Sequence, residues 1–274
     1  CISVCGLCKE LQIILAVLCL PDAASRESVA MIENPDVRVV DTSTAHRVAP
    51  GWAYGFPELS AERREAIITG KRVASPGCHA GGFIVLVQPL IEAGILPADA
   101  LLACHSLTGY SGGGKGMIAE YEAEGRAAAL SSPREYGLGQ THKHLPEMAG
   151  ISGLEHYPVF CPIVADFYSG MLVTVPLFGA QLNAGYTLAD VRECYKAKFT
   201  GSVVKYVDAM DEAGFIASNT LTGTDSMEVT ACGNDERMIL LSRFDNLGKG
   251  ASGAAVQCIN LMLGADETAG LVLA

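Results

Sequence analysis

Residues 75–82 read Ser75-Pro76-Gly77-Cys78-His79-Ala80-Gly81-Gly82, and they divide the chain into its two predicted halves. The apolar run 72–74 predicts a short strand, Pro-Gly ends it, and residues 83–93 have helical spacing. Cys78 is therefore expected where a strand passes into a helix. Unpaired N–H groups and the positive end of the helix dipole favour a thiolate there. We predict that Cys78 is a nucleophile; the alternative is a buried, inert cysteine.

The length and charge of the chain restrict its possible partners. With 274 residues and a hydrophobic fraction of 50%, it is expected to form one large domain or two moderate ones. Its formal net charge of -11 argues against nucleic acid or an anionic membrane as the main partner. A small molecule is expected instead.

The ten cysteines are scattered rather than grouped in a disulfide framework, which predicts a reducing compartment, the cytoplasm. Cys1, Cys5 and Cys8 have the C-x3-C-x2-C spacing of some iron–sulfur sites, but no strand precedes them, so we interpret the spacing as coincidence and expect no metal. The apolar run 11–20 is too short to span a membrane. Because the chain begins with cysteine, residues upstream are expected to be missing from this sequence.

The first half alternates strand and helix. Residues 13–20 and 37–41 are predicted strands, with a helix from Pro21 to about Glu33 between them. Apolar strands separated by helices predict a parallel sheet of the dinucleotide-binding, Rossmann-like type. Such a domain normally opens with a strand and a Gly-x-Gly-x-x-Gly turn, yet only Gly6 lies in the first fifty residues. The first βα unit is therefore expected to be missing.

Residues 41–47 follow the second predicted strand, at the sheet edge where parallel sheets bind ligands. Ser43 and Arg47 could hold a phosphate or a carboxylate, with Arg47 as the bidentate partner. The same residues could simply cap a turn, and the sequence favours neither interpretation.

A glycine-rich loop, residues 109–116, follows a predicted strand at residues 100–107 and precedes a predicted helix at residues 117–130. It resembles a nucleotide-triphosphate loop, but Gly116 stands where a magnesium-binding hydroxyl is required. The loop can still bind a single phosphate or an oxyanion through its N–H groups and a lysine. The candidates are Ser111, Gly112, Gly113 and Lys115.

His142 and His144 alternate in a segment that is predicted to be extended, because Pro146 argues against a helix. No further ligands stand at recognisable spacing, so an acid/base histidine ranks above a metal site. The sequence leaves open which of the two it is.

The second half is predicted to be α+β and mainly antiparallel. Strands are expected within residues 159–177 and at 203–207, a helix at 189–199, and a hairpin joining 228–232 to 238–244. An apolar helix at residues 251–263 is expected to pack against the first domain.

These motifs, in this order, resemble those of the N-acetyl-gamma-glutamyl-phosphate reductases, and most closely the shorter subfamily. The matching blocks are residues 41–59, 76–78, 109–115, 142–148 and 245–255. The resemblance implies a partial NADP-binding Rossmann domain at 1–77, an α+β catalytic and dimerisation domain at 78–246 like that of glyceraldehyde-phosphate and aspartate-semialdehyde dehydrogenases, and a returning helix at 247–274. It also implies a homo-oligomer.

The resemblance further implies NADPH-dependent reduction of N-acetylglutamyl phosphate in arginine biosynthesis, with an aminoadipyl or aspartyl phosphate as alternative substrates. Cys78 matches the nucleophile, and the acid/base histidine falls at His142 or His144, in the block that also contains Glu147. Ser43, Arg47 and the glycine loop fall on the substrate side. The cofactor side comprises Pro21, Asn246, Gly248, Lys249 and Gly250.

The chain departs from the family pattern beside its nucleophile. Ser75 replaces the usual asparagine, and His79-Ala80-Gly81 replaces an aromatic residue, a small residue and threonine. With the missing first βα unit, these departures leave two alternatives open: an inactive, truncated homologue with impaired NADPH binding, or a cysteine hydrolase that needs no cofactor.

Overall fold

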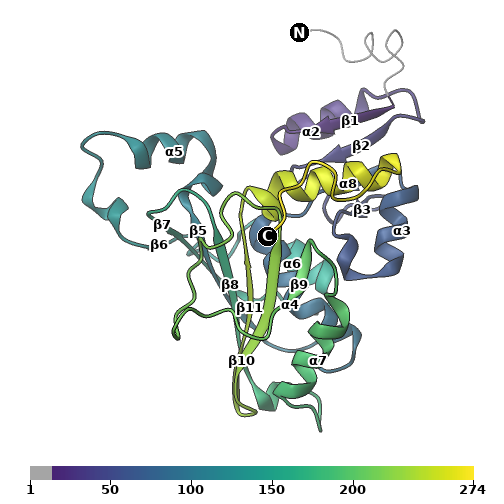
Figure 1. The fold of residues 1–274 in the computed structure, drawn as a ribbon. Helices are drawn as coiled ribbons and strands as arrows, with labels where there is room; N and C mark the ends of the chain where they lie inside the picture. Colours follow the sequence, from purple (N-terminus) through teal and green to yellow (C-terminus); the bar gives the residue numbers. More distant parts are fainter. Residues whose placement is uncertain (1–13) are drawn as a thin grey trace. The chain divides into compact units, whose positions relative to one another are not determined.

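The computed structural model describes residues 14–274, which form two compact units (Figure 1). Unit 1 contains the described residues up to Gly77 together with Ala254–Gly270. Unit 2 contains Cys78–Gly253 and Leu271–Ala274. The chain therefore passes from one unit to the other between Gly77 and Cys78, inside the stretch quoted above.

Unit 1 is a parallel α/β unit. Its four-stranded sheet has the order β1-β2-β4-β3, and every neighbouring pair is parallel. This confirms the predicted fold class of the first half. Its elements are β1 (Leu15–Leu18), α2 (Asp22–Ala30), β2 (Arg38–Asp41), β3 (Ala53–Tyr54), η1 (Pro57–Leu59), α3 (Ala61–Thr69), β4 (Arg72–Ala74) and α8 (Gly253–Leu263), of which only Gly253 belongs to unit 2.

The core of unit 1 joins the sheet to the last helix. Val40 of β2 and Val73 of β4 pack in one buried cluster with Cys258 and Met262 of α8. Arg38 donates hydrogen bonds to carbonyl groups at the end of α3, including that of Gly70 at 2.8 Å. Helix α8 is thus an integral part of unit 1, although it is 179 residues beyond β4.

Unit 2 is built on a seven-stranded sheet of order β6-β7-β5-β8-β11-β10-β9. The predicted hairpin is confirmed, because β10 and β11 pair antiparallel. The sheet is mixed, since β5 with β7 and β9 with β10 are parallel. Its elements are α4 (Cys78–Glu92), β5 (Ala103–Gly109), η2 (Tyr110–Gly113), α5 (Gly114–Glu122), η3 (Ala128–Ser131), β6 (Arg134–Glu135), α6 (Leu145–Ser152), β7 (Val159–Ala165), β8 (Met171–Phe178), η4 (Gly179–Gln181), α7 (Leu188–Lys198), β9 (Val204–Tyr206), β10 (Met227–Gly233), β11 (Arg237–Phe244) and η5 (Gly248–Ser252).

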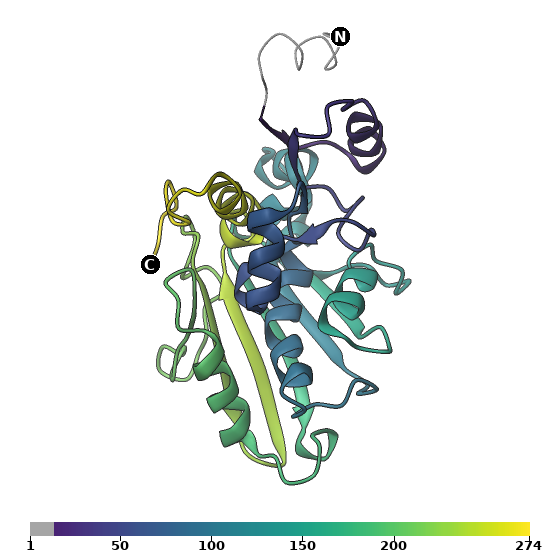
Figure 2. The same cartoon turned by 90° about the vertical axis from the view of Figure 1, so that its right-hand side faces the viewer.

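Helices cover one face of this sheet. Helix α4 packs on β8 and β11 and α7 packs on β10, on the same side of the strands (Figures 1 and 2). The packing is close at Gly82, where an added Cβ would lie 2.5 Å from Val173 and 2.8 Å from the Phe244 ring. Glycine is required there because any side chain would push the helix off the sheet.

The opposite face of the sheet carries side chains that alternate with the buried ones. In β8, Pro176 and Phe178 are exposed while Val175 and Leu177 are buried. Ile239 of β11 pairs with Pro176 and is 39% exposed on the same face. The part of this face around Pro176, Phe178 and Ile239 is therefore apolar and uncovered, whereas Leu241 and Arg243, farther along the same face of β11, are buried. We refer to the exposed apolar part as the uncovered face.

Two details of the sequence prediction were wrong. The segment that carries His142 and His144 is a turn that leads into α6, and Pro146 lies in the first turn of that helix. Proline fits there because its missing N–H would have no intrahelical partner. Helix α5 also ends at Glu122, earlier than predicted, because the backbone becomes extended at Ala123 and Gly125 takes a positive φ of 70°, neither of which continues a helix.

Three further expectations concern the chain as a whole. The spacing of Cys1, Cys5 and Cys8 lies outside the described residues. None of the seven cysteines within residues 14–274 is in a disulfide. In that same part of the chain, no helix is both long and apolar enough to span a membrane.

Candidate active site

Cys78 is the first residue of α4, four positions after the last residue of β4, as the sequence predicted. It is neither buried nor fully exposed. The first N–H groups of a helix have no intrahelical acceptors, so they and the helix dipole stabilise negative charge at this position. The thiol thus lies where a thiolate is favoured and where a substrate can reach it.

The η5 turn of unit 2 contacts Cys78 directly. A Cβ added to Gly250 would lie 3.0 Å from the Cβ of Cys78 and 3.2 Å from the Phe244 ring. The Gly250 N–H donates to the Asp245 carbonyl at 3.0 Å, which fixes the turn. Gly250, predicted on the cofactor side, therefore places its backbone, without a side chain, against Cys78.

His79 follows Cys78 and is 4% exposed. Its Nδ1 lies 2.6 Å from the Ser106 Oγ, and its Nε2 lies 2.8 Å from the Tyr136 hydroxyl. Burial, with a smaller effect from the charge of His142, lowers the pKa of His79 to about 3. The ring is therefore neutral at physiological pH.

His142 and His144 lie against this group. Their ring centroids are 4.8 Å apart, and the His79 ring is 6.1 Å from His142 and 5.6 Å from His144. Burial, and then the charge of Lys143, lower the pKa of His142. His144 is more deeply buried, at 6% exposed. His142 is therefore a neutral, partly accessible imidazole, which is what a base that works near neutral pH requires.

Glu147 and Lys249 are both predicted site residues, and both are buried. Glu147 is 2% exposed in the first turn of α6, and Lys249 is 3% exposed within η5. Because a buried charged group needs compensating partners, each of these side chains helps to stabilise the structure immediately around it.

Asn246 joins the two predicted binding segments of unit 2. Its Nδ2 donates to the Ser111 hydroxyl at 3.0 Å, and its Oδ1 accepts from the Gly170 N–H at 2.9 Å. The structure thus brings together a substrate-side and a cofactor-side candidate. Gly112 and Gly113 at the end of η2 and Lys115 in the first turn of α5 are exposed, and their predicted phosphate-binding role stays a prediction.

In unit 1, Ser43 and Arg47 lie in the turn after β2. The Ser43 hydroxyl donates to Asp41 at 2.8 Å, and Arg47 donates to the carbonyl groups of Thr42 at 3.1 Å and Ser75 at 2.9 Å. These contacts correspond to the turn-capping interpretation, and the ligand-binding role stays a prediction. Pro21 is the N-cap residue of α2 and is exposed.

Asp41 is the centre of this turn. It is fully buried and accepts hydrogen bonds from Ser43 and from the His46 ring, which stacks on Trp52 at 4.0 Å. Although burial opposes the charge, the hydrogen bonds from His46 and Ser43 lower the pKa of Asp41. The turn is thus organised around a buried carboxylate.

Sequence reasoning missed Ser106 and Tyr136. Ser106 lies in a strand that reads as ordinary core, and Tyr136 lies in a loop six residues before His142. The available signal was His79, a polar residue in the apolar start of α4 that needs buried partners. Within residues 14–274, no group of three or more His, Cys, Asp or Glu side chains is placed to hold a metal ion.

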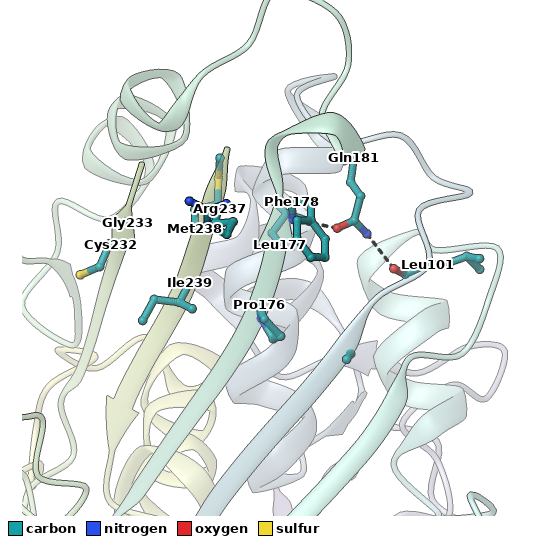
Figure 3. Close-up of a pocket in the computed structure, with 11 residues that line it drawn as sticks. Leu101, Pro176, Leu177, Phe178, Gln181, Cys232, Gly233, Arg237, Met238 and Ile239 are labelled. Atoms are coloured by element: carbon teal, nitrogen blue, oxygen red, sulfur yellow. Dashed lines mark hydrogen bonds between the residues drawn. The ribbon is translucent and has the colours of Figure 1, made fainter. Parts of the chain in front are cut away.

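A separate apolar pocket lies at the ends of β8 and β11 (Figure 3). Pro176, Phe178 and Ile239 line it, and Gln181 closes one side by donating to the Leu101 carbonyl at 2.8 Å. It contains none of the residues described around Cys78. We therefore assign it to the uncovered face of the sheet rather than to the site.

Two family models match the chain. The model described as the semialdehyde dehydrogenase dimerisation domain matches residues 78–246, and the one described as the semialdehyde dehydrogenase NAD binding domain matches residues 8–67. These descriptions agree with the predicted fold class and with the parallel and mixed sheets described above.

The two relatives described here are similar to this chain over most of its length, and they have the same name. The N-acetyl-gamma-glutamyl-phosphate reductase of Mesorhizobium japonicum is 45% identical over 260 residues, covering 91% of this chain and 83% of that protein. The protein of the same name from Burkholderia cenocepacia is 43% identical over 263 residues, covering 93% and 83%. The resemblance inferred from the motifs is thereby confirmed.

Solved structures show the same fold at low identity. Aspartate semialdehyde dehydrogenase II from Vibrio cholerae has a TM-score of 0.72 at 17% identity, covering 92% of this chain and 80% of that one. The aspartate semialdehyde dehydrogenase of Francisella tularensis has a TM-score of 0.70 at 12% identity, covering 92% and 82%. At these identities the likeness establishes the fold alone.

The lowered pKa of His79 predicts acid sensitivity. In the unfolded chain His79 binds a proton below pH 6.5, whereas in the folded protein it does so only near pH 3. The contribution of neutral His79 to the free energy of unfolding is therefore fully present above pH 6.5 and is lost as the pH decreases toward 3. His79 alone contributes a slope of about 1.4 kcal/mol per pH unit. Urea unfolding between pH 6.5 and 4.5 should show that His79→Phe reduces the slope by this amount. The exposed His156→Gln serves as the control and should keep it; an unchanged slope in His79→Phe would contradict the assignment.

Proposed function

This chain belongs to the N-acetyl-gamma-glutamyl-phosphate reductase family, and we propose that it catalyses the reaction of that name. It reduces N-acetyl-L-glutamyl 5-phosphate to N-acetyl-L-glutamate 5-semialdehyde with NADPH and releases phosphate, in arginine biosynthesis and in the cytoplasm. The observation that carries this proposal is Cys78 at the start of α4, followed by His79 in a histidine cluster in which the pKa values of His79 and His142 are lowered.

Cys78 is the nucleophile in this proposal. Its thiolate attacks the acyl carbon, a C–S bond forms, and the bond from carbon to the phosphate oxygen breaks, so that phosphate leaves with the electron pair. The product is a thioester. Reduction of that carbon gives a hemithioacetal, and breaking the C–S bond then releases the aldehyde and restores the thiolate.

A histidine handles the proton of the hemithioacetal oxygen. His142 is supported as this group because it is neutral and partly accessible, whereas His144 is buried beside it. A neutral imidazole can accept the proton as the aldehyde forms and return it in the reverse direction. We assign this role to His142. We propose that His144 and the buried Glu147 stabilise the structure around it.

Phosphate is bound, in this proposal, by the glycine loop. Ser111 is held by Asn246, and the exposed Gly112, Gly113 and Lys115 follow at the first turn of α5. N–H groups at a helix start, together with a lysine, favour an oxyanion. Ser43 and Arg47 of unit 1 are the second candidates for an anionic group of the substrate.

NADPH, when bound, supplies the hydride for the thioester carbon. Unit 1 fits a dinucleotide in one respect: β1, β2 and β4 are parallel, and their carboxyl ends lead to Pro21, Ser43 and Ser75. In unit 2, Gly250 places backbone rather than a side chain against Cys78. We propose that Pro21 contributes to cofactor binding in unit 1 and that Asn246, Gly248, Lys249 and Gly250 contribute to it in unit 2.

We also propose that the uncovered face of the unit 2 sheet joins two copies of the chain. Its apolar side chains include Phe178 at 63% and Ile239 at 39% exposed, around the pocket of Figure 3. Exposed apolar surfaces of this kind mark protein interfaces. The match of residues 78–246 to a family model described as a dimerisation domain supports a second copy as the partner.

An assay of the reverse reaction tests the proposed function. Wild type should reduce NADP with N-acetylglutamate semialdehyde only when phosphate is present. Cys78→Ala should lose at least about 10⁴-fold in kcat because it removes the nucleophile. Cys194→Ala, in α7, is the matched control and should keep full activity.

Inactive folded wild type would overturn the proposal, and NADPH titration would then distinguish the alternatives. An inactive homologue with an impaired cofactor site shows no saturable binding. A cofactor-independent cysteine hydrolase would instead turn over a thiol-reactive ester with no nicotinamide present.

The interface proposal is tested by size-exclusion chromatography with light scattering. Ile239→Glu places a charge within the uncovered face, and burying that charge in an interface should shift the chain to monomer. Tyr186→Glu, at an exposed aromatic residue before α7, should leave the oligomer intact. A folded Ile239→Glu variant that stays oligomeric would show that this face is not the interface.

A further inference from the structure

Three side chains near Cys78 are linked in series by hydrogen bonds. Ser106 of β5 lies 2.6 Å from Nδ1 of His79, and the hydroxyl of Tyr136 lies 2.8 Å from its Nε2. Ser106 is fully buried, His79 is 4% exposed, and Tyr136 is only partly buried. This series of hydrogen bonds thus runs from the core of unit 2 to a partly accessible tyrosine.

The direction of these hydrogen bonds is limited by the charge of His79. A neutral imidazole has one N–H and one acceptor nitrogen, so only two arrangements are possible. In the first, Ser106 donates to Nδ1, and Nε2–H donates to the Tyr136 oxygen. In the second, Tyr136 donates to Nε2, and Nδ1–H donates to the Ser106 oxygen.

The burial of Ser106 determines which of these two hydrogen-bond arrangements is favoured. Among residues 14–274, the only hydrogen-bond partner of its hydroxyl is Nδ1 of His79. The second arrangement would leave the serine hydrogen in the buried core with no acceptor, which is unfavourable. The first arrangement instead leaves unpaired only the hydrogen of the Tyr136 hydroxyl, which is less deeply buried than Ser106. The hydrogen bonds therefore run from Ser106 to His79 and from His79 to Tyr136.

In this arrangement, the hydrogen of the Tyr136 hydroxyl is available to another group. Within the described residues, that hydroxyl has His79 as its only hydrogen-bond partner. Burial, and then the negative charge of Cys78, raise the pKa of Tyr136. The hydroxyl consequently stays protonated near the nucleophile and acts as a donor rather than a base.

We propose that Tyr136 donates a hydrogen bond to the oxygen of the substrate carbon that Cys78 holds, and that His79 and Ser106 are positioning residues that fix its direction. This inference rests on the proposed function. The carbonyl oxygen gains negative charge whenever the carbon becomes tetrahedral, and an oriented donor stabilises it most at that point. The proton itself is not transferred, so His142 keeps the acid/base role.

The histidine tautomer tests the direction without any substrate. Nitrogen-15 NMR of labelled wild type, with the His79 signals identified by their loss in His79→Gln, should show Nε2 protonated and Nδ1 unprotonated between pH 6 and 8. A protonated Nδ1 would overturn the direction, whatever the turnover of the enzyme.

Kinetics test whether His79 acts through Tyr136. Tyr136→Phe should lower kcat about 100-fold with little change in KM, as expected for loss of one oxyanion donor. His79→Phe should lower kcat about 10- to 100-fold in wild type but cause no further loss in the Tyr136→Phe background. His79→Gln, whose amide can accept from Ser106 and donate to Tyr136, should recover part of the loss.

The controls separate this role from a structural one. Ser106→Ala should lower kcat, whereas Ser152→Ala, which removes another buried hydroxyl, should not. Equal losses from His79→Phe in both backgrounds, or full activity in Ser106→Ala, would overturn the positioning role. Wild type without turnover would overturn the proposed function and the donor role of Tyr136 with it, and the NMR result would still decide the hydrogen-bond direction.

Discussion

The close contact of α4 with the unit 2 sheet is the constraint on which the site depends. At Gly82 there is no room for a Cβ between the helix and Val173 or Phe244, so the axis of α4 is fixed in position. This fixes Cys78 at the start of the helix, and Gly250 then packs its backbone against that residue. His79 consequently points into the core, where Ser106 meets it.

The same packing determines the electrostatics of the site. Because His79 is buried, its neutral form is favoured, and this ring adds no positive charge beside Cys78 at physiological pH. The helix start, N–H groups and hydroxyl donors are then available to stabilise negative charge. In the proposed mechanism, these fixed dipoles stabilise the anionic intermediate, while the partly accessible His142 exchanges the proton.

The sequence correctly predicted the features that are determined by residues close together along the chain. The Pro-Gly break before Cys78, the parallel α/β alternation and the β10–β11 hairpin were read correctly, because turn residues and apolar periodicity determine them. The extended form expected for His142 and His144 was wrong, because proline is compatible with a first helical turn. Ser106 and Tyr136 were missed, since their importance comes from contacts with His79 across 27 and 57 residues. Contacts of that range are set by tertiary packing.

The central claim, that Cys78 forms the covalent link to the acyl group, is tested most directly by the half-reaction without NADPH. Folded protein mixed with N-acetylglutamyl phosphate and quenched in acid should release one phosphate per chain. Mass spectrometry should then find one N-acetylglutamyl group, attached to the peptide that contains Cys78. Phosphate released in the same amount by Cys78→Ala, or an acyl group on another residue, would contradict the account.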